Sequence, residues 1–405
     1  MRNLDIYIHV PFCLSKCIYC DFYSVPLSIR KNGLLWKIAE ESRKLTKKYA
    51  EAVKKELNLY KDNGFLTERK IDAVYFGGGT PSIMTPSDIE EILSAVRRNA
   101  YLADDAEITI ETNPATAGLE ELSGFRKAGV NRISIGCQSF VEEELQILGR
   151  RHSISDAGRI IKDARAAGFE NLSLDLIFGV PGSNSGRWNE SLSKAIEFHP
   201  EHISCYGMTV EEGTQLSGMI NDGSLTLPGD EEQREMYLEA AVIFKSAGLN
   251  QYEISNFARQ DYECRNNLNY WNGGEYLGLG ASAHSCAVKK SLSGILMSRK
   301  RRWNIEDVDE YMNRCEKGLF PEAGGEEVTG EKLAGEAVML GLRMTEGIDI
   351  ENFKKQYGVE LLSKWGKEIG CLQDAGLLAV NDGRMLLTIE GVLLSNEVFS
   401  EFMAG

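Results

Sequence analysis

The sequence has 405 residues, 43% hydrophobic and 26% charged, so one large domain followed by a small one is expected. Its formal net charge of −15 argues against a nucleic-acid partner held by general electrostatics. No apolar run approaches the roughly 18 to 20 residues that span a bilayer, and Asp5 interrupts the apolar N-terminus where a signal peptide needs continuity, so a cytoplasmic protein is predicted.

Short β-rich runs with helix-like segments between them occupy the first half of the chain, at residues 4–10, 71–79, 107–114, 131–140, 171–182 and 202–210. Helix-start signals support the alternation, because Thr85, Pro86 and Asp88 precede apolar residues at helical spacing. Mostly apolar strands that alternate with helices are typical of a parallel sheet covered by helices. The sequence therefore predicts an α/β fold, a partial barrel of about six strand–helix units.

Each predicted strand ends on glycine or on a polar residue. These ends carry His9, the glycines and threonine of residues 77–80, Glu111, Gln138, Asp175 and Tyr206. A structural role explains any one of them. In a parallel barrel, however, the C-terminal strand ends form one rim where ligands bind. The pattern predicts that these residues surround one mouth.

A long charged stretch at residues 36–61 carries an apolar stripe of Leu45, Tyr49, Val53, Leu57 and Tyr60 at helical spacing. This pattern predicts an amphipathic helix on the outside of the barrel, with no part in the chemistry.

The strand–helix rhythm stops near residue 287. Residues 299–302, all basic, are interpreted as an exposed loop or as a clamp for an anion, and the glycine-rich, acidic residues 316–330 as a linker. The tail has helical segments and then a hairpin that turns at Asn381, Asp382 and Gly383. We expect a barrel at 1–286, a connecting segment at 287–331 and a winged-helix-like α+β module at 332–405. Because this module is not strongly basic, a lid or packing role is favoured over DNA binding.

Three cysteines lie within eight residues at Cys13, Cys17 and Cys20, beside several aromatic residues. Clustered cysteines in a large cytosolic chain point to a metal or redox centre rather than to disulfides. Three thiolates in one loop can hold a cubane iron–sulfur cluster, leaving one iron open for another ligand. The alternative is zinc with His9 as the fourth ligand, which Pro11 disfavours by stiffening the path between His9 and Cys13.

The stretches YIHVPFCLSKCIYCDF, YFGGGTPS, IETNP, SIGCQSF, LGRRH and LDLIFGVPG resemble radical S-adenosylmethionine proteins of the oxygen-independent coproporphyrinogen III oxidase group, and most of all its haem-chaperone branch. The resemblance covers nearly the whole chain. It implies a partial (β/α)6, TIM-like barrel with a C-terminal module. It also implies a [4Fe–4S] cluster on Cys13, Cys17 and Cys20, with S-adenosylmethionine on the fourth iron and release of a 5′-deoxyadenosyl radical after reduction.

The same resemblance assigns the residues around the cofactor. Tyr7 and Tyr19 would pack against the cluster or S-adenosylmethionine. Gly78, Gly79 and Thr80 would contact the backbone atoms of S-adenosylmethionine. Glu111 would bind the polar groups of S-adenosylmethionine, and Gln138, Arg150 and Asp175 would line the rest of the cofactor pocket.

Two departures bear on the function. Phe22 stands where the oxidases have a further cysteine, which speaks against decarboxylase activity and for haem binding and delivery. Asn266 stands where the chaperone branch has a histidine linked to haem binding, and asparagine is not a usual haem ligand. Cys264, His284 and Tyr270 are the remaining candidate ligands.

Three functions stay open: a haem carrier, a radical enzyme acting on a tetrapyrrole, and a nucleic-acid modifier, the last disfavoured by charge. The expected partners are haem or a porphyrin, a haem acceptor of unknown identity and a reducing electron donor, and a homodimer stays open.

Overall fold

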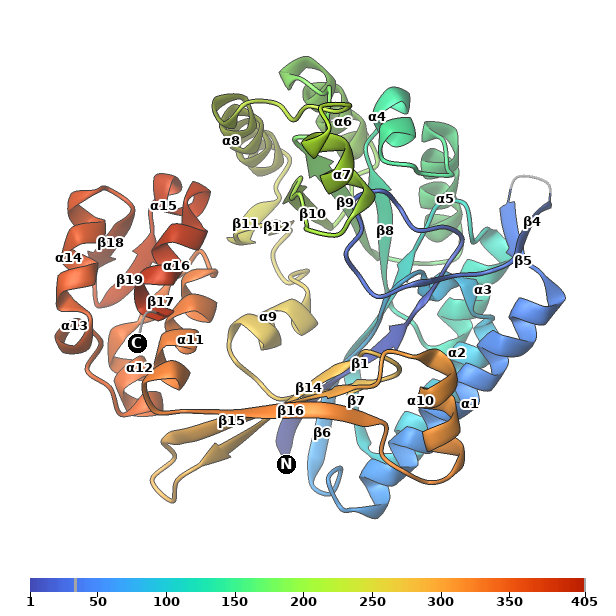
Figure 1. Cartoon of the computed structure of the whole chain (residues 1–405), viewed down its shortest axis with the longest axis horizontal. Helices are drawn as coiled ribbons and strands as arrows, with labels where there is room; N and C mark the ends of the chain where they lie inside the picture. The colour runs from blue at the N-terminus through green and yellow to red at the C-terminus, as the bar shows by residue number, and fades with distance from the viewer. Residues whose placement is uncertain (33–34, 404–405) are drawn as a thin grey trace.

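The chain is described by a computed structural model, which covers residues 1–32 and 35–403. Within these residues one sheet of twelve strands runs through the molecule, in the order β11-β12-β10-β9-β8-β7-β6-β1-β13-β14-β15-β16. Helices cover its outer face, and a separate small module lies at one end (Figure 1).

Six neighbouring strands are parallel and form the curved centre of the sheet. They are β1 Arg2–Val10, β6 Arg69–Gly78, β7 Tyr101–Thr112, β8 Arg132–Gln138, β9 Asn171–Phe178 and β10 His202–Gly207. Each of the six predicted runs is therefore a strand. The two edge strands, β11 and β16, are not paired with each other in the described chain, so the barrel is partial, as expected.

The covering helices follow the parallel strands in sequence. They are α1 Glu40–Asp62, α2 Pro86–Asn99, α3 Leu119–Ala128, α4 Glu142–Ile147, α5 Ile154–Ala166, α6 Ser185–Glu197, α7 Gln215–Asn221 and α8 Asp230–Ser246. Helix α2 begins as predicted, because the Thr85 hydroxyl accepts from the Asp88 amide at 3.1 Å while Asp88 accepts from the Thr85 amide at 3.1 Å. A short 3-10 turn, Pro81–Ile83, precedes it.

Helix α1 begins later than the predicted stretch, since Leu35–Ile38 is strand β5, paired with β4 Ile29–Asn32. The predicted stripe faces inward, with Tyr49, Val53, Leu57 and Tyr60 buried. The helix also carries a buried polar group that the stripe did not indicate. Glu56 accepts hydrogen bonds from the Gly280 amide at 2.9 Å, Asn304 at 2.7 Å and Tyr311 at 2.7 Å.

The six parallel strands are extended on both sides, next to β10 and next to β1. On one side lie β12 Asn256–Ala258 and β11 Asn250–Glu253, and on the other β13 Tyr276–Leu279, β14 His284–Lys290, β15 Leu296–Asn304 and β16 Glu322–Thr329. Helix α9 Arg265–Trp271 and helix α10 Val308–Glu316 lie between them in sequence.

The prediction of a linker at residues 316–330 is wrong, because residues 322–329 form the edge strand β16. The predicted basic loop is wrong too, since Arg299–Arg302 lie within β15. Arg301 forms ion pairs with Glu326 and Glu336, and Arg302 pairs with Glu322 at 3.7 Å. Charges that read as loop signals are thus cross-strand pairs.

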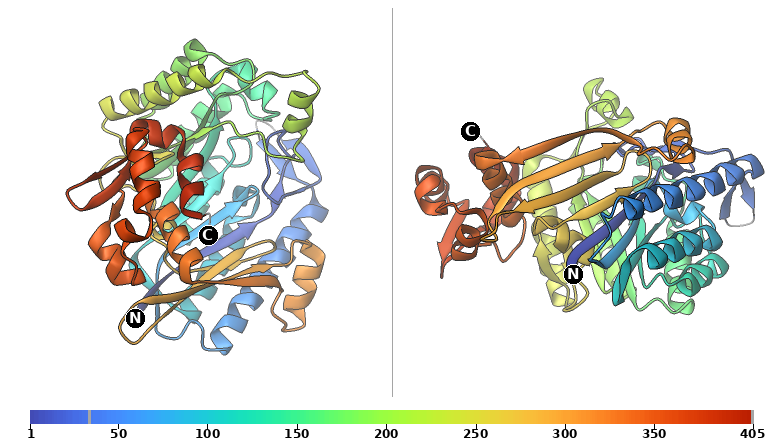
Figure 2. Two further views of the ribbon diagram at one scale, coloured as in Figure 1. Left: turned by 60° about the vertical axis from the view of Figure 1, so that its left-hand side comes forward. Right: turned by 90° about the horizontal axis from the view of Figure 1, so that it is seen from below.

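The C-terminal residues pack around a second hydrophobic core that includes Val338, Phe353, Trp365, Met385 and Phe399. Its elements are α11 Gly330–Leu342, β17 Ile348–Asp349, α12 Ile350–Tyr357, α13 Leu361–Lys364, α14 Gly366–Asp374, β18 Leu378–Asn381, β19 Arg384–Leu387, α15 Ile389–Leu393 and α16 Ser395–Met403. The predicted hairpin turns at Asp382 and Gly383, whose φ angles are 48° and 76°. Strands β14–β16 extend from the barrel to this winged-helix-like module (Figure 2).

No helix of the described residues has the length and apolar character needed to cross a bilayer.

Candidate functional site

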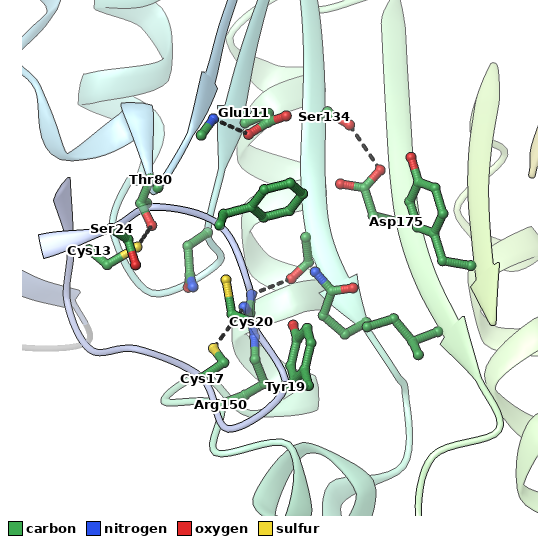
Figure 3. Close-up of a pocket in the computed structure, with 18 of the residues that line it drawn as sticks. Cys13, Cys17, Tyr19, Cys20, Ser24, Thr80, Glu111, Ser134, Arg150 and Asp175 are labelled. Carbon is green, nitrogen blue, oxygen red and sulfur yellow. Dashed lines mark hydrogen bonds between the residues drawn. The ribbon is translucent and has the colours of Figure 1, made fainter. Parts of the chain in front are cut away.

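A cavity of 510 Å³ opens at the C-terminal ends of the parallel strands, beside the cysteine loop (Figure 3). The resemblance assigned twelve site residues, and all but Tyr7 line this cavity. They are Cys13, Cys17, Tyr19, Cys20, Gly78, Gly79, Thr80, Glu111, Gln138, Arg150 and Asp175. The expectation that the strand ends surround one mouth is confirmed for residues of β6, β7, β8, β9 and β10.

Tyr7 lies behind the cavity wall. Its hydroxyl is 3.1 Å from Nδ1 of His9, and its ring stacks on Tyr75 with centroids 6.2 Å apart. Tyr75 is the residue that reaches the cavity. Tyr7 therefore supports the wall through Tyr75, and its packing against the cluster or S-adenosylmethionine stays a prediction.

The cysteine loop is closed by a short pair of strands, β2 Phe12–Cys13 and β3 Val25–Pro26. Between them, Cys17 and Cys20 form a tight turn, in which the Cys20 amide donates to the Cys17 carbonyl at 3.2 Å. Two neighbours contact the thiols: Thr80 Oγ1 lies 3.4 Å from Cys13 Sγ, and Arg150 Nη1 lies 3.6 Å from Cys17 Sγ. The loop is thus held against the strand ends by its own ligand-bearing residues.

In the alternative zinc site, His9 would have to be the fourth ligand, but its ring is already engaged. Both ring nitrogens of His9 are engaged, Nδ1 with the Tyr7 hydroxyl and Nε2 with the Tyr23 carbonyl, each at 3.1 Å. Among the described residues, no three His, Cys, Asp or Glu side chains converge closely enough for a single metal ion. A wider polynuclear cluster suits three separate thiols better than one zinc ion.

The donor set and its surroundings fit an iron–sulfur cluster. All three cysteines are free thiols and half-buried. Burial raises the pKa of the Cys13 and Cys20 thiols, so their thiolates need the positive charge of bound iron. The Arg150 guanidinium supplies a further positive charge beside Cys17. It would help to hold the excess negative charge of a thiolate-bound cluster.

The glycines at the end of β6 also position the cysteine loop. Their amides are already used, with Gly78 donating to Glu111 at 3.2 Å, Gly79 to Val10 at 2.8 Å and the Thr80 amide to Phe12 at 2.8 Å. A Cβ at Gly79 would lie 2.7 Å from the Phe12 carbonyl oxygen. The glycines let β6 approach the start of the cysteine loop, and so fix that loop over the cavity.

The cavity floor carries two carboxylates. Glu111 accepts from the Tyr75 hydroxyl at 2.9 Å, and Asp175 accepts from the Ser134 hydroxyl at 2.9 Å. Burial, with repulsion from Asp175, raises the pKa of Glu111 to about 7, and burial also raises the pKa of Asp175. Two mutually repelling acids in one cavity form a site for a ligand that brings positive charge or donates hydrogen bonds.

Other polar groups of the wall have spare hydrogen-bonding capacity. Ser24 Oγ, Thr112 Oγ1 and Arg150 Nε are buried and without a hydrogen-bond partner in the described chain, and their residues line the cavity. Gln138 adopts a φ of 66°, which is uncommon for a residue other than glycine and is typical of functional sites. These groups fit a polar ligand of the size of S-adenosylmethionine.

Several lining residues were not predicted, among them Tyr75, Asn113, Arg132 and Ser134. Tyr75 and Ser134 lie within strands and Arg132 is the first residue of β8, so none of the three stands at a C-terminal strand end, and all face into the barrel. A signal was available, because polar residues alternate with apolar ones at 5, 7 and 9, at 107, 109 and 111, and at 132 and 134. That alternation indicates a polar barrel interior.

The segment that corresponds to the haem-linked motif forms helix α9. Its Trp271 ring lies under the Arg343 guanidinium at 4.3 Å, and Tyr270 contacts Trp271 edge-on with centroids 4.9 Å apart. Trp271 thus joins the barrel to the C-terminal module. Cys264 and Asn267, at the start of this segment, reach the cavity, whereas Asn266 and His284 are not among its lining residues.

Comparisons with known proteins agree with this architecture. Residues 7–195 match the radical SAM superfamily, and residues 328–394 match the HemN C-terminal domain. The chain is 33% identical to the haem chaperone HemW of Bacillus subtilis, over 98% of each chain. It is 31% identical to the mitochondrial radical S-adenosyl methionine domain-containing protein 1 of Danio rerio, over 97% of this chain and 85% of that protein.

The solved structure of coproporphyrinogen III oxidase (HemN) from Escherichia coli superposes with a TM-score of 0.80 at 21% identity, covering 100% of this chain and 90% of that one. At this identity the likeness shows the shared fold. The full-length similarity to the HemW proteins shows more, and the chain belongs to the radical S-adenosylmethionine superfamily, in the family of the haem chaperone HemW.

Proposed function

We propose that this chain binds haem and delivers it to an acceptor protein, and that it does not act as a coproporphyrinogen decarboxylase. Membership of the radical SAM superfamily implies a [4Fe–4S] cluster and S-adenosylmethionine as its cofactors. The observation that carries the proposal is the 33% identity to HemW over 98% of both chains, with the cluster cysteines gathered on one cavity.

The cofactor roles of the individual residues are part of this proposal. Cys13, Cys17 and Cys20 hold the cluster, which with S-adenosylmethionine supplies one-electron reductive chemistry when both are bound. Arg150 donates toward Cys17 Sγ at 3.6 Å and places its positive charge beside the cluster ligands. Thr80 donates its hydroxyl proton toward Cys13 Sγ at 3.4 Å, which favours the thiolate form of that ligand.

The acids of the cavity floor recognise the positive end of S-adenosylmethionine. Glu111 is fixed by the Tyr75 hydroxyl and the Gly78 amide, so its orientation is set before a ligand arrives. A bound ammonium or sulfonium group relieves the repulsion between Glu111 and Asp175. The polar atoms of Ser24, Thr112 and Arg150 that lack protein partners are the remaining contacts available to it.

Phe22 supports carriage over decarboxylation. It stands at the position of the additional cysteine of the oxidases, lines the cavity and is 68% exposed. A phenylalanine supplies neither a thiol nor an acid to the cavity, but it adds apolar surface at the mouth. The oxidase alternative rests on the shared fold with HemN.

One anaerobic experiment separates the two functions. Reconstituted protein is incubated with dithionite, S-adenosylmethionine and coproporphyrinogen III, and in parallel it is titrated with haemin. We expect saturable haemin binding with a shifted Soret band and no protoporphyrinogen. Formation of protoporphyrinogen together with 5′-deoxyadenosine would establish the oxidase instead.

A further inference from the structure

The proposed function leaves open which side chain binds haem iron, since the position of the motif histidine is Asn266. Asparagine does not serve as an axial haem ligand, whereas cysteine, tyrosine and histidine do. Cys264, Tyr270 and His284 are the three candidates near this part of the chain. Their surroundings differ enough to choose between them.

Cys264 is poorly suited. Its side chain is 1% exposed and lies 3.6 Å from Glu107 Oε1, to which the thiol donates. Burial raises the pKa of Cys264 to about 12 despite the nearby Arg132, so the thiol stays protonated near neutral pH. A thiolate ligand at this place would face the Glu107 carboxylate inside the protein.

Tyr270 is exposed, but its ring has a packing role. It contacts Trp271 edge-on at 4.9 Å and lies 5.5 Å from Tyr276. Trp271 in turn lies under Arg343 and fastens α9 to the C-terminal module. Moving Tyr270 to reach an iron would disturb this aromatic cluster.

His284 is exposed and uncommitted. It is the first residue of β14, and within the described residues neither of its ring nitrogens has a hydrogen-bond partner. Its ring stacks on Trp303 of β15, with centroids 5.8 Å apart and an interplanar angle of 28°. A stacked imidazole keeps its orientation, and its free nitrogen edge stays open to a ligand.

The sheet register puts this pair on the cofactor side of the sheet. Tyr7 pairs with Gly278 across β1 and β13, and His284 pairs with Trp303 across β14 and β15. Tyr276 pairs with Cys286, so Gly278 and His284, each two residues along from that pair, share its face. Tyr7 faces the barrel interior with Tyr75, and His284 and Trp303 therefore face the same way.

The pair also lies next to the cysteine loop. The turn that leads into β14 packs against His9, since a Cβ at Gly280 would lie 2.5 Å from the His9 carbonyl oxygen, and the centroid of the His9 ring lies 6.3 Å from that of Tyr23 in the loop. A ligand on His284 would thus lie near the cysteine loop, at the exposed start of β14.

Resting on the proposed function, we propose that His284 is the axial ligand of the haem iron, with haem held at the exposed His284 end of β14, beside the cysteine loop. Trp303 is a positioning residue that holds the imidazole by stacking. An exposed ligand suits a carrier, because an acceptor protein can reach the iron from the opposite face of the porphyrin. A buried ligand would hinder that transfer.

Haemin titration of the reconstituted protein, followed by absorbance and electron paramagnetic resonance, tests the assignment. His284→Asn is compared with His199→Asn, which removes another exposed histidine far from the cavity, and with Cys264→Ala. We expect at least a tenfold loss of affinity and loss of the low-spin spectrum in His284→Asn only, with free imidazole restoring that spectrum. Iron and sulfide contents and circular dichroism report whether each variant has folded.

Trp303→Ala should weaken haemin binding severalfold and alter the low-spin resonance, and Trp303→Phe should recover both, because a phenyl ring can still stack on the imidazole. If wild type shows no saturable haemin binding, the proposed function fails and the ligand assignment falls with it. If wild type binds and His284→Asn binds equally well, only the assignment is overturned. Loss of binding in Cys264→Ala would likewise overturn it, in favour of a thiolate.

Discussion

Glu56 and Glu111 are both buried carboxylates, and burial raises the pKa of each to about 7, yet they lie in regions of opposite character. Glu56, on α1, is 0% exposed and its oxygens accept three hydrogen bonds from three separate elements. Glu111 accepts two, faces Asp175 and borders the cavity. A raised pKa therefore reports burial, and only the adjoining open space with unpaired polar atoms marks a binding site.

The largest expected effect is the loss of bound iron when one cluster thiol is removed, compared with removal of a thiol near Glu56. Cys17→Ala should lose nearly all bound iron and acid-labile sulfide while keeping its thermal stability, because Cys17 is half-buried and is not part of the main hydrophobic core. Cys315→Ala, a buried thiol close to Glu56, should keep its iron. Iron and sulfide analysis of anaerobically reconstituted protein measures both. A Cys17→Ala variant with full iron content would contradict the ligand assignment.

Truncation of the two carboxylates should affect different properties: the Glu56 variant should lose stability, and the Glu111 variant should lose S-adenosylmethionine affinity. Glu56→Ala leaves the Gly280 amide, Asn304 and Tyr311 without their acceptor, so we expect a loss of about 3 kcal/mol in the free energy of unfolding. Glu111→Ala should cost less than about 1 kcal/mol, because it removes a buried acid that Asp175 repels. Only the second variant should lose S-adenosylmethionine affinity, by tenfold or more. Chemical denaturation and calorimetric titration separate these effects, and equal destabilisation would refute the distinction.

The two carboxylates also differ in what their ionisation changes: Glu56 affects only the stability of the fold, whereas Glu111 also affects ligand binding. Each acid has a pKa raised from 4.5 to about 7, so the unfolded chain ionises first and stability falls as pH rises from about 4.5 to 7. For Glu56 this loss is about 3 kcal/mol, and Glu56→Gln should flatten the profile. S-adenosylmethionine binding should strengthen over the same pH range through ionisation of Glu111, but not in Glu111→Gln. Binding that is independent of pH in wild type would argue against the contact with Glu111.

The smallest effect concerns the contact between the barrel and the C-terminal module. Arg343→Ala removes the guanidinium that lies 4.3 Å from the Trp271 ring, so a destabilisation of about 1 kcal/mol is expected. Arg343→Lys should restore part of it. Thermal denaturation detects the change, and haemin affinity should stay the same if the segment equivalent to the haem-linked motif is structural here. Loss of haemin binding in Arg343→Ala would show that α9 takes part directly.

The parallel strands could be predicted because their side chains alternate with a short period and their ends are marked by glycine, proline and polar residues. The rim residues Glu111, Gln138 and Asp175 followed from those ends. Strands β15 and β16 could not be recognised, since their pairing depends on contacts such as Arg301 with Glu326 between segments far apart in sequence. A run of arginines and a run of glycine and glutamate each resemble a loop when read alone.

The site residues within strands were missed for another reason. Ser134 was treated as part of an apolar strand, although Arg132 and Ser134 alternate with apolar residues there. Tyr75 had no such signal, because the other residues on its face of the strand are Ile71, Ala73 and Gly77. The role of Tyr7 was also beyond the sequence, because it depends on the stack with Tyr75 that keeps Tyr7 behind the wall. Glu56 was hidden in a charged helix, where its burial follows only from the packing of α1 against β13 and α10.

The central claim is that three thiolates hold an iron–sulfur cluster with one iron open to S-adenosylmethionine in this cavity. Electron paramagnetic resonance of the dithionite-reduced protein, recorded with and without S-adenosylmethionine, tests it most directly. We predict a cubane signal whose g values shift when S-adenosylmethionine is added. A protein that contains zinc instead of iron and sulfide, or a signal unchanged by S-adenosylmethionine, would contradict the claim.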